Sequence, residues 1–362
     1  MNVPKLRFND FNDDYQNITI GDVLKIKSGR DQKQVENKNG IYPILGTSGQ
    51  IGRTNSFLYD KPSVLIGRKG TINKPQYMDT PFWTVDTLFY SDIFKPNVPK
   101  YIYYLFQNIN WNKYDESTGV PSLNCKTIES IKTSIPSVNE QNKIAKFLSL
   151  LDKKIELQSQ KIEALKLYKI CIKNIIFNDE KYTETKLKYI LKKWTEKNKN
   201  NEYDYVESVS NKHGFISQNE QFEDRNVASK DKSNYYVIRK NVFAYNPSRL
   251  DVGSLALKDN DLVSLVSPLY ECFTTNQNVY FMLEWFDSKE FKKGTFSKFE
   301  GGVRNTLSFT NLCEINISLP SITEQDKIAN ILMTFNNKLI YENEKLKQLK
   351  NLKKGLIQNM FV

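Results

Sequence analysis

The sequence has little of the side-chain chemistry on which most active sites depend. Its 362 residues include one histidine, His213, and four cysteines, Cys125, Cys171, Cys272 and Cys313, without a C-x-x-C spacing. A histidine triad or metal site needs partners around the histidine, and a zinc ribbon or disulfide framework needs closely spaced cysteines. We therefore predict no metal site, a surface position for His213, and four buried thiols.

Long hydrophobic runs and nucleotide-binding signatures are also missing. No apolar run approaches the 18 or so residues of a membrane span, and the first residues lack a signal-peptide core. No Gly-x-Gly turn follows a strand-like run, and no Gly-x-x-x-x-Gly-Lys-Ser/Thr loop is present. We expect a soluble cytoplasmic protein that binds no cofactor itself.

A stretch of 43 residues, 135–177, recurs at 319–361 without a gap, and 14 of the positions are identical. Each copy opens with Pro-Ser-x-x-Glu-Gln. The proline ends any preceding helix, and a serine followed three residues later by glutamate is the capping-box signature of a new helix. Two copies predict an internal repeat with two-fold character.

Both copies carry an apolar ladder with alternating steps of four and three residues. The first ladder is Ile144, Leu148, Leu151, Ile155, Gln158, Ile162, Leu165, Lys169, Ile172 and Ile176. The second is Ile328, Leu332, Phe335, Leu339, Glu342, Leu346, Leu349, Lys353, Leu356 and Met360. More than four heptads predict a coiled coil; a long amphipathic helix on a globular core is the alternative. The ladder corresponds to a rod of about 50 Å at 1.5 Å per residue.

Composition and charge divide the chain into five parts. A polar, acidic tail that looks mobile covers 1–18, strand-rich globular segments cover 19–136 and 179–320, and long helices cover 137–178 and 321–362. The net charge of +11 comes mainly from the first globular segment and the two helices, while segment 179–320 is balanced. A basic excess of this kind favours a polyanionic partner. A Lys-rich proteome would produce the same excess.

The globular segments share an order of elements but hardly any residues. In the first, short strands up to Tyr90 precede a helix over 99–108 and a Gly119 loop. In the second, strand-like runs up to Val279–Leu283 precede a helix over 284–293 and a Gly301 loop. We expect α/β (α+β) segments in which strands come before helices.

The chain resembles the specificity (S) subunit of type I restriction-modification systems. The resemblance rests on Pro-Ser-x-x-Glu-Gln-x-Lys-Ile-Ala at the head of each helix, on Ser63–Gly70, and on Val242–Arg249 followed by Val266–Tyr270. It implies two target-recognition domains, each reading half of a split site in double-stranded DNA, and two antiparallel helices that act as spacer. It also implies docking of two methyltransferase (M) subunits and of restriction (R) subunits. A rod of about 50 Å exceeds one turn of DNA, about 34–36 Å, so an unread gap would separate the half-sites.

Candidate DNA contacts are cationic residues in loops. Arg68 and Lys69 lie in a glycine-bracketed turn where backbone and cation can approach phosphate. The other candidates are Arg30, Lys33, Arg53, Lys74, Arg225, Lys230, Arg239, Arg249 and Arg304. Arginine suits guanine edges, and Asn or Gln suits adenine, which adds Gln50, Asn73, Asn246 and Asn305. Each of them could instead be a solvated charge or a turn residue.

Catalysis is not expected in this chain. Asn246-Pro-Ser-Arg249 is only superficially similar to the Asn/Asp-Pro-Pro-aromatic motif of amino-methyltransferases, because Ser248 and Arg249 occupy the last two places. The resemblance implies that S-adenosylmethionine, ATP and Mg²⁺ bind to partner subunits. The rival hypotheses are a self-sufficient DNA methyltransferase or nuclease with duplicated DNA-binding domains, and a coiled-coil interaction protein with an incidentally basic surface.

Overall fold

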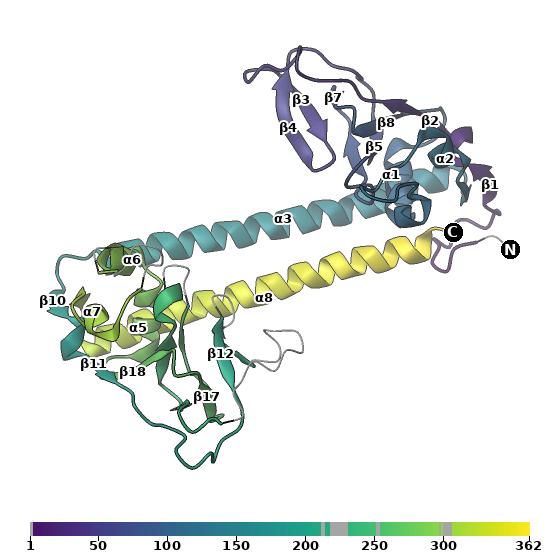
Figure 1. Ribbon diagram of the computed structural model, residues 1–362. Coiled ribbons are helices and arrows are strands. Elements are labelled where there is room, and N and C mark those ends of the chain that lie inside the picture. The colour runs from purple at the N-terminus through teal and green to yellow at the C-terminus, as the bar shows by residue number, and fades with distance from the viewer. Residues whose placement is uncertain (1–2, 211–213, 218–230, 251–253, 297, 300–305) are drawn as a thin grey trace. The chain divides into compact units, whose positions relative to one another are not determined.

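A computed structural model describes residues 3–210, 214–217, 231–250, 254–296, 298–299 and 306–362 (Figure 1). The chain forms two compact units, one of residues 1–160 and 343–362, the other of residues 161–342. The boundary between them crosses both long helices, α3 (Val138–Phe177) and α8 (Ile322–Met360). Each unit therefore contains one globular segment and a part of each long helix.

The globular segment of unit 1 is rich in short strands. Its elements are β1 (Gln16–Thr19), a 3-10 turn (Ile20–Asp22), β2 (Leu24–Ser28), β3 (Tyr42–Gly46), β4 (Gly49–Thr54), β5 (Ser63–Gly67), β6 (Gln76–Met78), β7 (Trp83–Thr84), β8 (Leu88–Ile93), α1 (Pro99–Asn108), a 3-10 turn (Trp111–Tyr114), α2 (Cys125–Ser130) and β9 (Lys132–Ile135). The aromatic helix expected over 99–108 is confirmed as α1.

Unit 2 follows a similar order, with an additional strand and an additional helix among its described elements. Its elements are β10 (Thr183–Lys186), a 3-10 turn (Leu187–Tyr189), β11 (Leu191–Lys193), β12 (Glu207–Ser210), β13 (Gly214–Ser217), β14 (Tyr236–Ile238), β15 (Phe243–Tyr245), a 3-10 turn (Pro247–Arg249), β16 (Leu255–Leu257), β17 (Ser264–Val266), β18 (Glu271–Thr275), α5 (Val279–Phe286), α6 (Lys289–Phe296), α7 (Phe309–Cys313) and β19 (Asn316–Leu319).

The central sheets of the two units have the same topology. Unit 1 has the strand order β2-β8-β5-β6 and unit 2 the order β11-β18-β15-β16, with all pairs antiparallel. Each unit also has a two-stranded sheet at the base of a long helix, β1-β9 or β10-β19. The predicted fold class is confirmed: two α+β units carry an internal repeat together with a pair of long helices.

In each unit, a segment of α3 lies antiparallel to a segment of α8. In unit 1 the Nζ of Lys353 is 2.6 Å from Asp152 Oδ1. In unit 2 Lys161 pairs with Glu342, and the Nζ of Lys169 is 2.6 Å from Asn336 Oδ1. In unit 2 the partner on α8 moves from residue 342 to residue 336 as the residue on α3 moves from 161 to 169, so the two helix segments run antiparallel.

All twenty ladder positions are buried or half-buried, including the polar ones. At one end of the ladders, Ile144 and Leu148 share the core of unit 1 with Met360 of α8. At the other end, Ile328 and Leu332 share the core of unit 2 with Phe177 of α3. The two helices thus contribute directly to the cores of the globular segments.

The glutamine of each repeated motif ties its helix to a helix of the globular segment. In unit 1, Gln141 is 1% exposed; its Nε2 donates to Pro136 O at 3.1 Å and its Oε1 accepts from Val98 N at 3.0 Å. In unit 2, Gln325 makes the same contacts with Pro320 O and Asn278 N, at 3.0 and 3.1 Å. Val98 and Asn278 are the N-caps of α1 and α5.

The motif glutamates take different partners from those of a capping box. Glu140 is 1% exposed and accepts hydrogen bonds from the Arg7 guanidinium, at 2.9 and 2.8 Å, and from Tyr15 Oη at 3.1 Å. Glu324 accepts from Tyr182 Oη at 3.2 Å and pairs with Lys181. Each carboxylate therefore anchors the chain segment that precedes the first strand of its unit.

The prediction of a mobile tail over residues 1–18 is wrong for its described part. Arg7 pairs with Glu140, Phe8 packs edge-to-face on Phe147 at 5.7 Å, and Tyr15 is 4% exposed. The tail is polar overall, but its arginine and one of its tyrosines bond to a buried carboxylate, and one of its phenylalanines packs on α3. Burial in the apolar surroundings, together with Glu140, raises the pKa of Tyr15 and keeps its hydroxyl protonated as a donor.

Two further expectations are corrected. The strand expected at Val279–Leu283 is the first part of helix α5, because the Asn278 side chain accepts from Tyr280 N and Phe281 N, both at 2.9 Å, and caps a helix start. Of the four cysteines only Cys272 is buried, whereas Cys171 is exposed on α3. His213 lies outside the described residues.

A network of charges fixes α3 to α5 in unit 2. Glu284 of α5 forms ion pairs with Lys169, at 2.8 Å from Oε1, and with Lys173, at 3.0 Å from Oε2. The Asn336 side chain of α8 also donates a hydrogen bond to Oε1 at 2.7 Å. The side chains of Lys173 and Glu284 are each 7% exposed. Burial opposes the ionisation of Glu284, but Lys173 and Lys169 outweigh it and hold the pKa below its usual 4.5.

This network predicts a pH-dependent contribution to stability. Because the pKa of Glu284 is lower in the folded state, its stabilisation is present above about pH 4.5 and is lost as the pH falls through the lowered value. We expect Glu284→Gln to reduce the free energy of unfolding by about 3 kcal/mol at neutral pH. The difference from the wild type should shrink below pH 4.5 in urea denaturation at several pH values.

The matched control is Glu163→Gln. Glu163 forms an exposed pair with Lys166 one turn along α3, and such pairs contribute less than about 1 kcal/mol. A loss at Glu284 that is independent of pH would contradict the assignment of its stabilising role to the carboxylate charge.

Candidate nucleic-acid interface

Four of the predicted contacts flank one edge of the central sheet in unit 1. Arg30 follows the end of β2, Arg68 and Lys69 follow the end of β5, and Lys74 precedes β6. The register brings these ends together with the start of β8, since Ser28 lies opposite Phe89, and Gly67 opposite Leu88. All four side chains are exposed. We call this edge of unit 1 the basic edge.

The backbone holds the basic edge tightly. Arg30 N donates to Thr84 O and Arg68 N to Thr87 O, both at 2.8 Å, so the two arginines flank the turn between β7 and β8. A Cβ on Gly29 would lie 2.0 Å from Val85 O, which permits only glycine at this approach. Gly70 has a φ of +90° and donates to Pro121 O at 2.8 Å, which attaches the Gly119 loop to the Arg68–Lys69 turn.

Two other candidates of unit 1 do not directly adjoin the strand ends of this edge. The Arg53 guanidinium on β4 donates from Nε to Gly40 O at 2.6 Å and from Nη2 to Ile41 O at 3.1 Å, and thus braces the loop before β3. Lys33 is exposed in the loop between β2 and β3, where its N–H donates to Asp31 Oδ1 at 3.0 Å.

In unit 2 only Arg249, among the predicted contacts that the structure describes, occupies a comparable place. It lies in the turn after β15, the strand equivalent to β5, and its side chain is exposed. Arg239 is half-buried and holds Glu196 through Nη2 at 2.7 Å and through Nε. Arg225, Lys230 and Arg304 lie outside the described residues.

The additional Asn and Gln candidates divide in the same way. Gln50, beside the tip of the β3–β4 hairpin, and Asn73, before β6, are exposed. Asn246 is engaged in structure, because its Oδ1 accepts from Ser248 N at 3.0 Å and caps the turn that carries Arg249. Asn305 lies outside the described residues.

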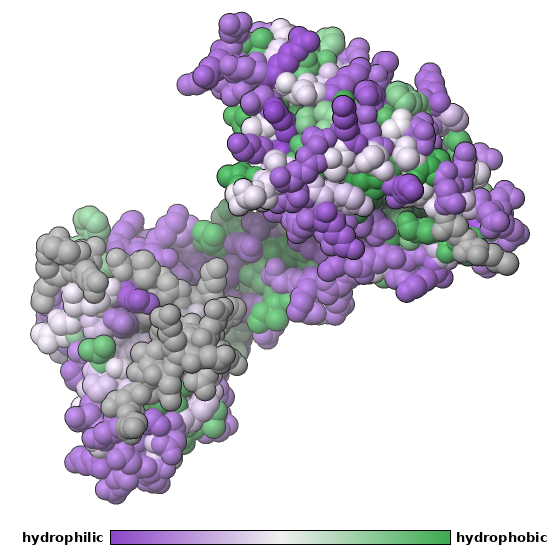
Figure 2. Space-filling model, turned by 45° about the vertical axis from the view of Figure 1, so that its right-hand side comes forward, coloured by the Kyte–Doolittle hydropathy of each residue, from purple (hydrophilic) through white to green (hydrophobic). Residues whose placement is uncertain are grey.

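A second surface feature was not anticipated: each long helix exposes large apolar side chains. Three pairs of positions 184 residues apart are exposed in both copies, namely Phe147 with Ile331, Leu157 with Tyr341, and Tyr168 with Leu352. Their spacings of 10 and 11 residues are about 2.8 and 3.1 turns, which keeps the three positions within about 80° of one another, on one side of each helix. Apolar side chains are visible on the helix surface in Figure 2. We call these six residues the apolar stripe.

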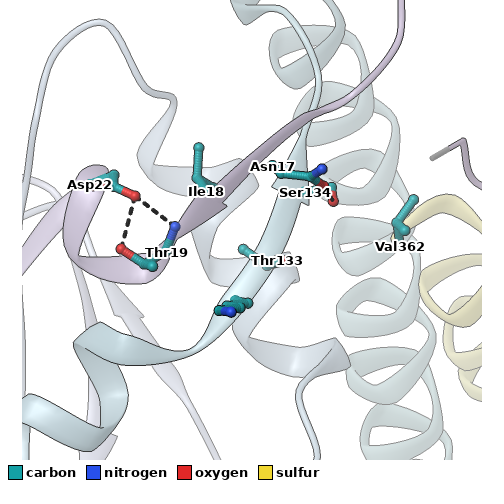
Figure 3. A pocket seen from close by; sticks show the side chains of 8 residues that line it. Asn17, Ile18, Thr19, Asp22, Thr133, Ser134 and Val362 are labelled. Carbon is teal, nitrogen blue, oxygen red and sulfur yellow. Dashed lines mark hydrogen bonds between the residues drawn. The ribbon is translucent and has the colours of Figure 1, made fainter.

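A cavity of about 610 Å³ lies beside the β1–β9 sheet (Figure 3). It is lined by Asn17, Ile18, Thr19, Asp22, Lys132, Thr133, Ser134 and Val362. The Asp22 carboxylate accepts from Thr19 N at 2.6 Å and from Thr19 Oγ1 at 2.8 Å, which lowers the pKa of Asp22. The Asp22 carboxylate in the lining of this cavity is therefore engaged in the turn before β2.

Neither a metal cluster nor a membrane span is found in the part of the chain that the structure describes. There, no group of three or more histidine, cysteine or acidic side chains is arranged to hold a metal ion. No helix in that part combines the length and the apolar character required to cross a membrane.

The geometry defines a class: duplicated α+β units with loop-bearing sheet edges, built on paired long helices. The family model of the type I restriction modification DNA specificity domain matches residues 12–167 and 182–351. The chain belongs to this family, and the resemblance found in the sequence is confirmed.

Sequence relatives and solved structures agree with this assignment. The EcoprrI specificity subunit of Escherichia coli is 24% identical over 43% of this chain and 40% of its own length. The EcoDI specificity subunit of Escherichia coli is 23% identical over 52% of this chain and 41% of its own length. The aligned region thus spans about two fifths of these curated relatives.

The similarity to solved structures extends over the whole fold. The S subunit of a type I restriction-modification system from M. genitalium has a TM-score of 0.64 at 18% identity and covers 99% of both chains. A second solved structure was reported as the structural basis underlying complex assembly and conformational transition of the type I R-M system. It has a TM-score of 0.56 at 11% identity and covers 95% of this chain and 96% of that one.

Proposed function

We propose that this chain is the sequence-specific DNA-binding subunit of a type I restriction-modification complex. In this proposal, residues 19–136 and 179–320 are target-recognition domains that each read half of a bipartite site. The helices 137–178 and 321–362 act as the spacer. The chain performs no catalysis.

The observation that carries the proposal is the equivalence of two sheet edges. Arg68 follows β5 and Arg249 follows β15, and these strands hold the same place in two sheets of the same topology. The surrounding loops differ in sequence, as two readers of different half-sites require. Cations near glycine turns suit phosphate contacts, and arginine suits guanine edges.

The remaining parts of the complex follow from the same proposal. Two M subunits dock on the long helices, and R subunits join the full complex. S-adenosylmethionine, ATP and Mg²⁺ bind to those partners, and the complex acts in the cytoplasm, where its double-stranded DNA is. The rival hypothesis, a self-sufficient methyltransferase or nuclease, requires binding of S-adenosylmethionine or a metal ion by the isolated chain, which calorimetry detects.

The primary test is an exchange of the first domain. Residues 19–135 are replaced by the corresponding segment of another family member, the chain is co-expressed with its M subunits, and methylated genomic DNA is sequenced. We expect a bipartite motif in which only one half changes. A motif without two halves, or a change in both, would refute the division of labour between the domains.

A second prediction concerns the basic edge. Replacing Arg68 and Lys69 by glutamine should weaken DNA binding by the assembled complex and reduce the slope of log K against log salt by about 0.9 for each phosphate that the protein no longer neutralises. Fluorescence anisotropy at several salt concentrations measures both quantities. Arg53→Gln is the control, because that guanidinium braces a loop and should leave the slope unchanged.

A third prediction concerns the apolar stripe. Leu157 and Tyr341 are 54% and 65% exposed in the chain alone, so lysine at both positions should not disturb folding. Burying two charges in an apolar helix interface is strongly unfavourable, so co-purification of M subunits should fall at least about tenfold. Lysine at Leu262, an exposed residue of unit 2 outside the helices, should leave assembly intact. Equal M binding by both variants would exclude the stripe as the docking surface.

A further inference from the structure

An exposed aliphatic side chain lies at the basic edge of unit 1. Val120 is 56% exposed. It precedes Pro121, whose carbonyl accepts from Gly70 N at 2.8 Å, and Leu123 N of the same loop donates to Arg68 O at 2.9 Å. Backbone hydrogen bonds thus attach the loop that carries Val120 to the turn that carries Arg68.

Further hydrogen bonds close this loop at its base. The Asp115 carboxylate accepts from Ser117 N at 3.0 Å, from Ser117 Oγ at 2.8 Å and from Ser122 N at 2.9 Å. Glu116 N also donates to Ser122 O at 3.1 Å. The bonds that Asp115 accepts lower its pKa and so favour the ionised acceptor. Val120 is therefore carried by a loop whose two ends are fixed.

The corresponding edge of unit 2 has an exposed leucine near its arginine. Tyr245, at the end of β15, lies opposite Glu271, at the start of β18. Arg249 follows β15, and Leu269, which is 75% exposed, lies two residues before β18. The register therefore brings the turns that carry Arg249 and Leu269 to the same edge of the sheet.

The turn that carries Leu269 is fixed as well. Tyr270 N donates to Ser267 O at 3.1 Å, which closes a β-turn, and Pro268 restricts the backbone at the second position of this turn. Tyr270 Oη accepts from Val209 N at 3.3 Å, which ties the turn to β12. Leu269 thus stays exposed on a braced turn.

The two units supply this aliphatic side chain from different loops. The place two residues before β8 in unit 1 belongs to Asp86, an exposed acid, and the Gly119 loop carries the aliphatic residue instead. Single exposed apolar side chains are common on protein surfaces. A packing requirement of the shared fold, however, would place such a side chain at equivalent positions. Its recurrence from different loops, each time near an arginine, points to the ligand of these edges.

We propose that Val120 and Leu269 determine specificity by contacting the 5-methyl group of a thymine, each in the half-site of its own unit. This inference rests on the proposed function and names a feature of the bases that are read. In the major groove thymine alone presents a methyl group. An aliphatic side chain packs against this methyl group, whereas beside a base-edge donor or acceptor it would leave a polar group without a partner. The neighbouring arginines suit phosphate or guanine, so the aliphatic residue adds a base that they do not read.

The experiment uses the chain assembled with its M subunits and a duplex that carries the bipartite site found by sequencing methylated DNA. Each thymine of the site, on either strand, is replaced in turn by uracil, which pairs in the same way but lacks the methyl group. Competition fluorescence anisotropy measures the ratio of the affinities for the thymine and uracil duplexes. For the wild type we expect a position in each half-site at which uracil weakens binding about fourfold, the effect of one buried methyl group.

Alanine variants assign these positions to the two residues. In Leu269→Ala, uracil should no longer weaken binding in the half-site of unit 2, while the other half-site stays sensitive. Val120→Ala should show the reverse, so each variant is the control for the other. Leu262→Ala truncates an exposed leucine at the other end of β17 and should keep both sensitivities.

Three results would overturn the proposal: uracil that weakens binding at no position, a half-site made only of G·C pairs, or alanine variants that keep the full sensitivity to uracil. A merely structural role of Val120 or Leu269 gives the third result, because it lowers the affinities for both duplexes alike. A methylation motif without two halves would refute the proposed function itself, so the two failures are distinguishable.

Discussion

Burial of one glutamine amide at the start of each long helix sets the geometry of its unit. The amide spans the carbonyl of the motif proline and the N-cap amide of the globular helix. Neither backbone group could be left without a partner in the core, because an unsatisfied buried polar group costs about 1–3 kcal/mol. The position and direction of α1 and α5 relative to the long helices therefore follow from Gln141 and Gln325. The glutamates beside these glutamines hold the chain segment that leads into each unit. Tyr15 donates a hydrogen bond to Glu140, and Tyr182 donates one to Glu324.

The two copies of the repeat keep the same geometry while their electrostatics diverge. Lys169 and Lys353 hold matching ladder positions, yet Lys169 contacts Glu284 and Asn336, whereas Lys353 contacts Asp152 and lies 5.4 Å from the centre of the Tyr104 ring. Both arrangements neutralise a lysine in a mostly apolar seam. Lys169 has the buried Glu284 carboxylate, and Lys353 has the half-buried Asp152 carboxylate together with an aromatic face. A duplicated frame can therefore keep its backbone while each copy acquires its own charge pattern.

The periodicity of the sequence made the two long helices predictable. The start of α5 and the docked tail depend on tertiary contacts and were not predicted. The four-three spacing identified every buried ladder position because it reflects helix geometry alone. The start of α5 was missed because Val279–Leu283 is rich in strand-forming residues, and the cap by Asn278 and the buried surroundings outweigh that preference. The docked tail could not be foreseen, since its partner Glu140 lies 133 residues away from Arg7.

The candidate interface shows the same limit at the level of single side chains. Arg53, Arg68 and Arg239 are indistinguishable in sequence as loop or strand-end arginines. The guanidinium of Arg53 donates to two carbonyls and that of Arg239 holds Glu196, whereas that of Arg68 has one long bond, of 3.4 Å, to Asp86 O beside the start of β8. Strand register is the missing information, because it decides which loop ends meet at one edge. Residues at such an edge can vary without disturbing the ladder, the motif glutamines or the sheet cores, so the contacts that hold the fold leave the loops free to change specificity.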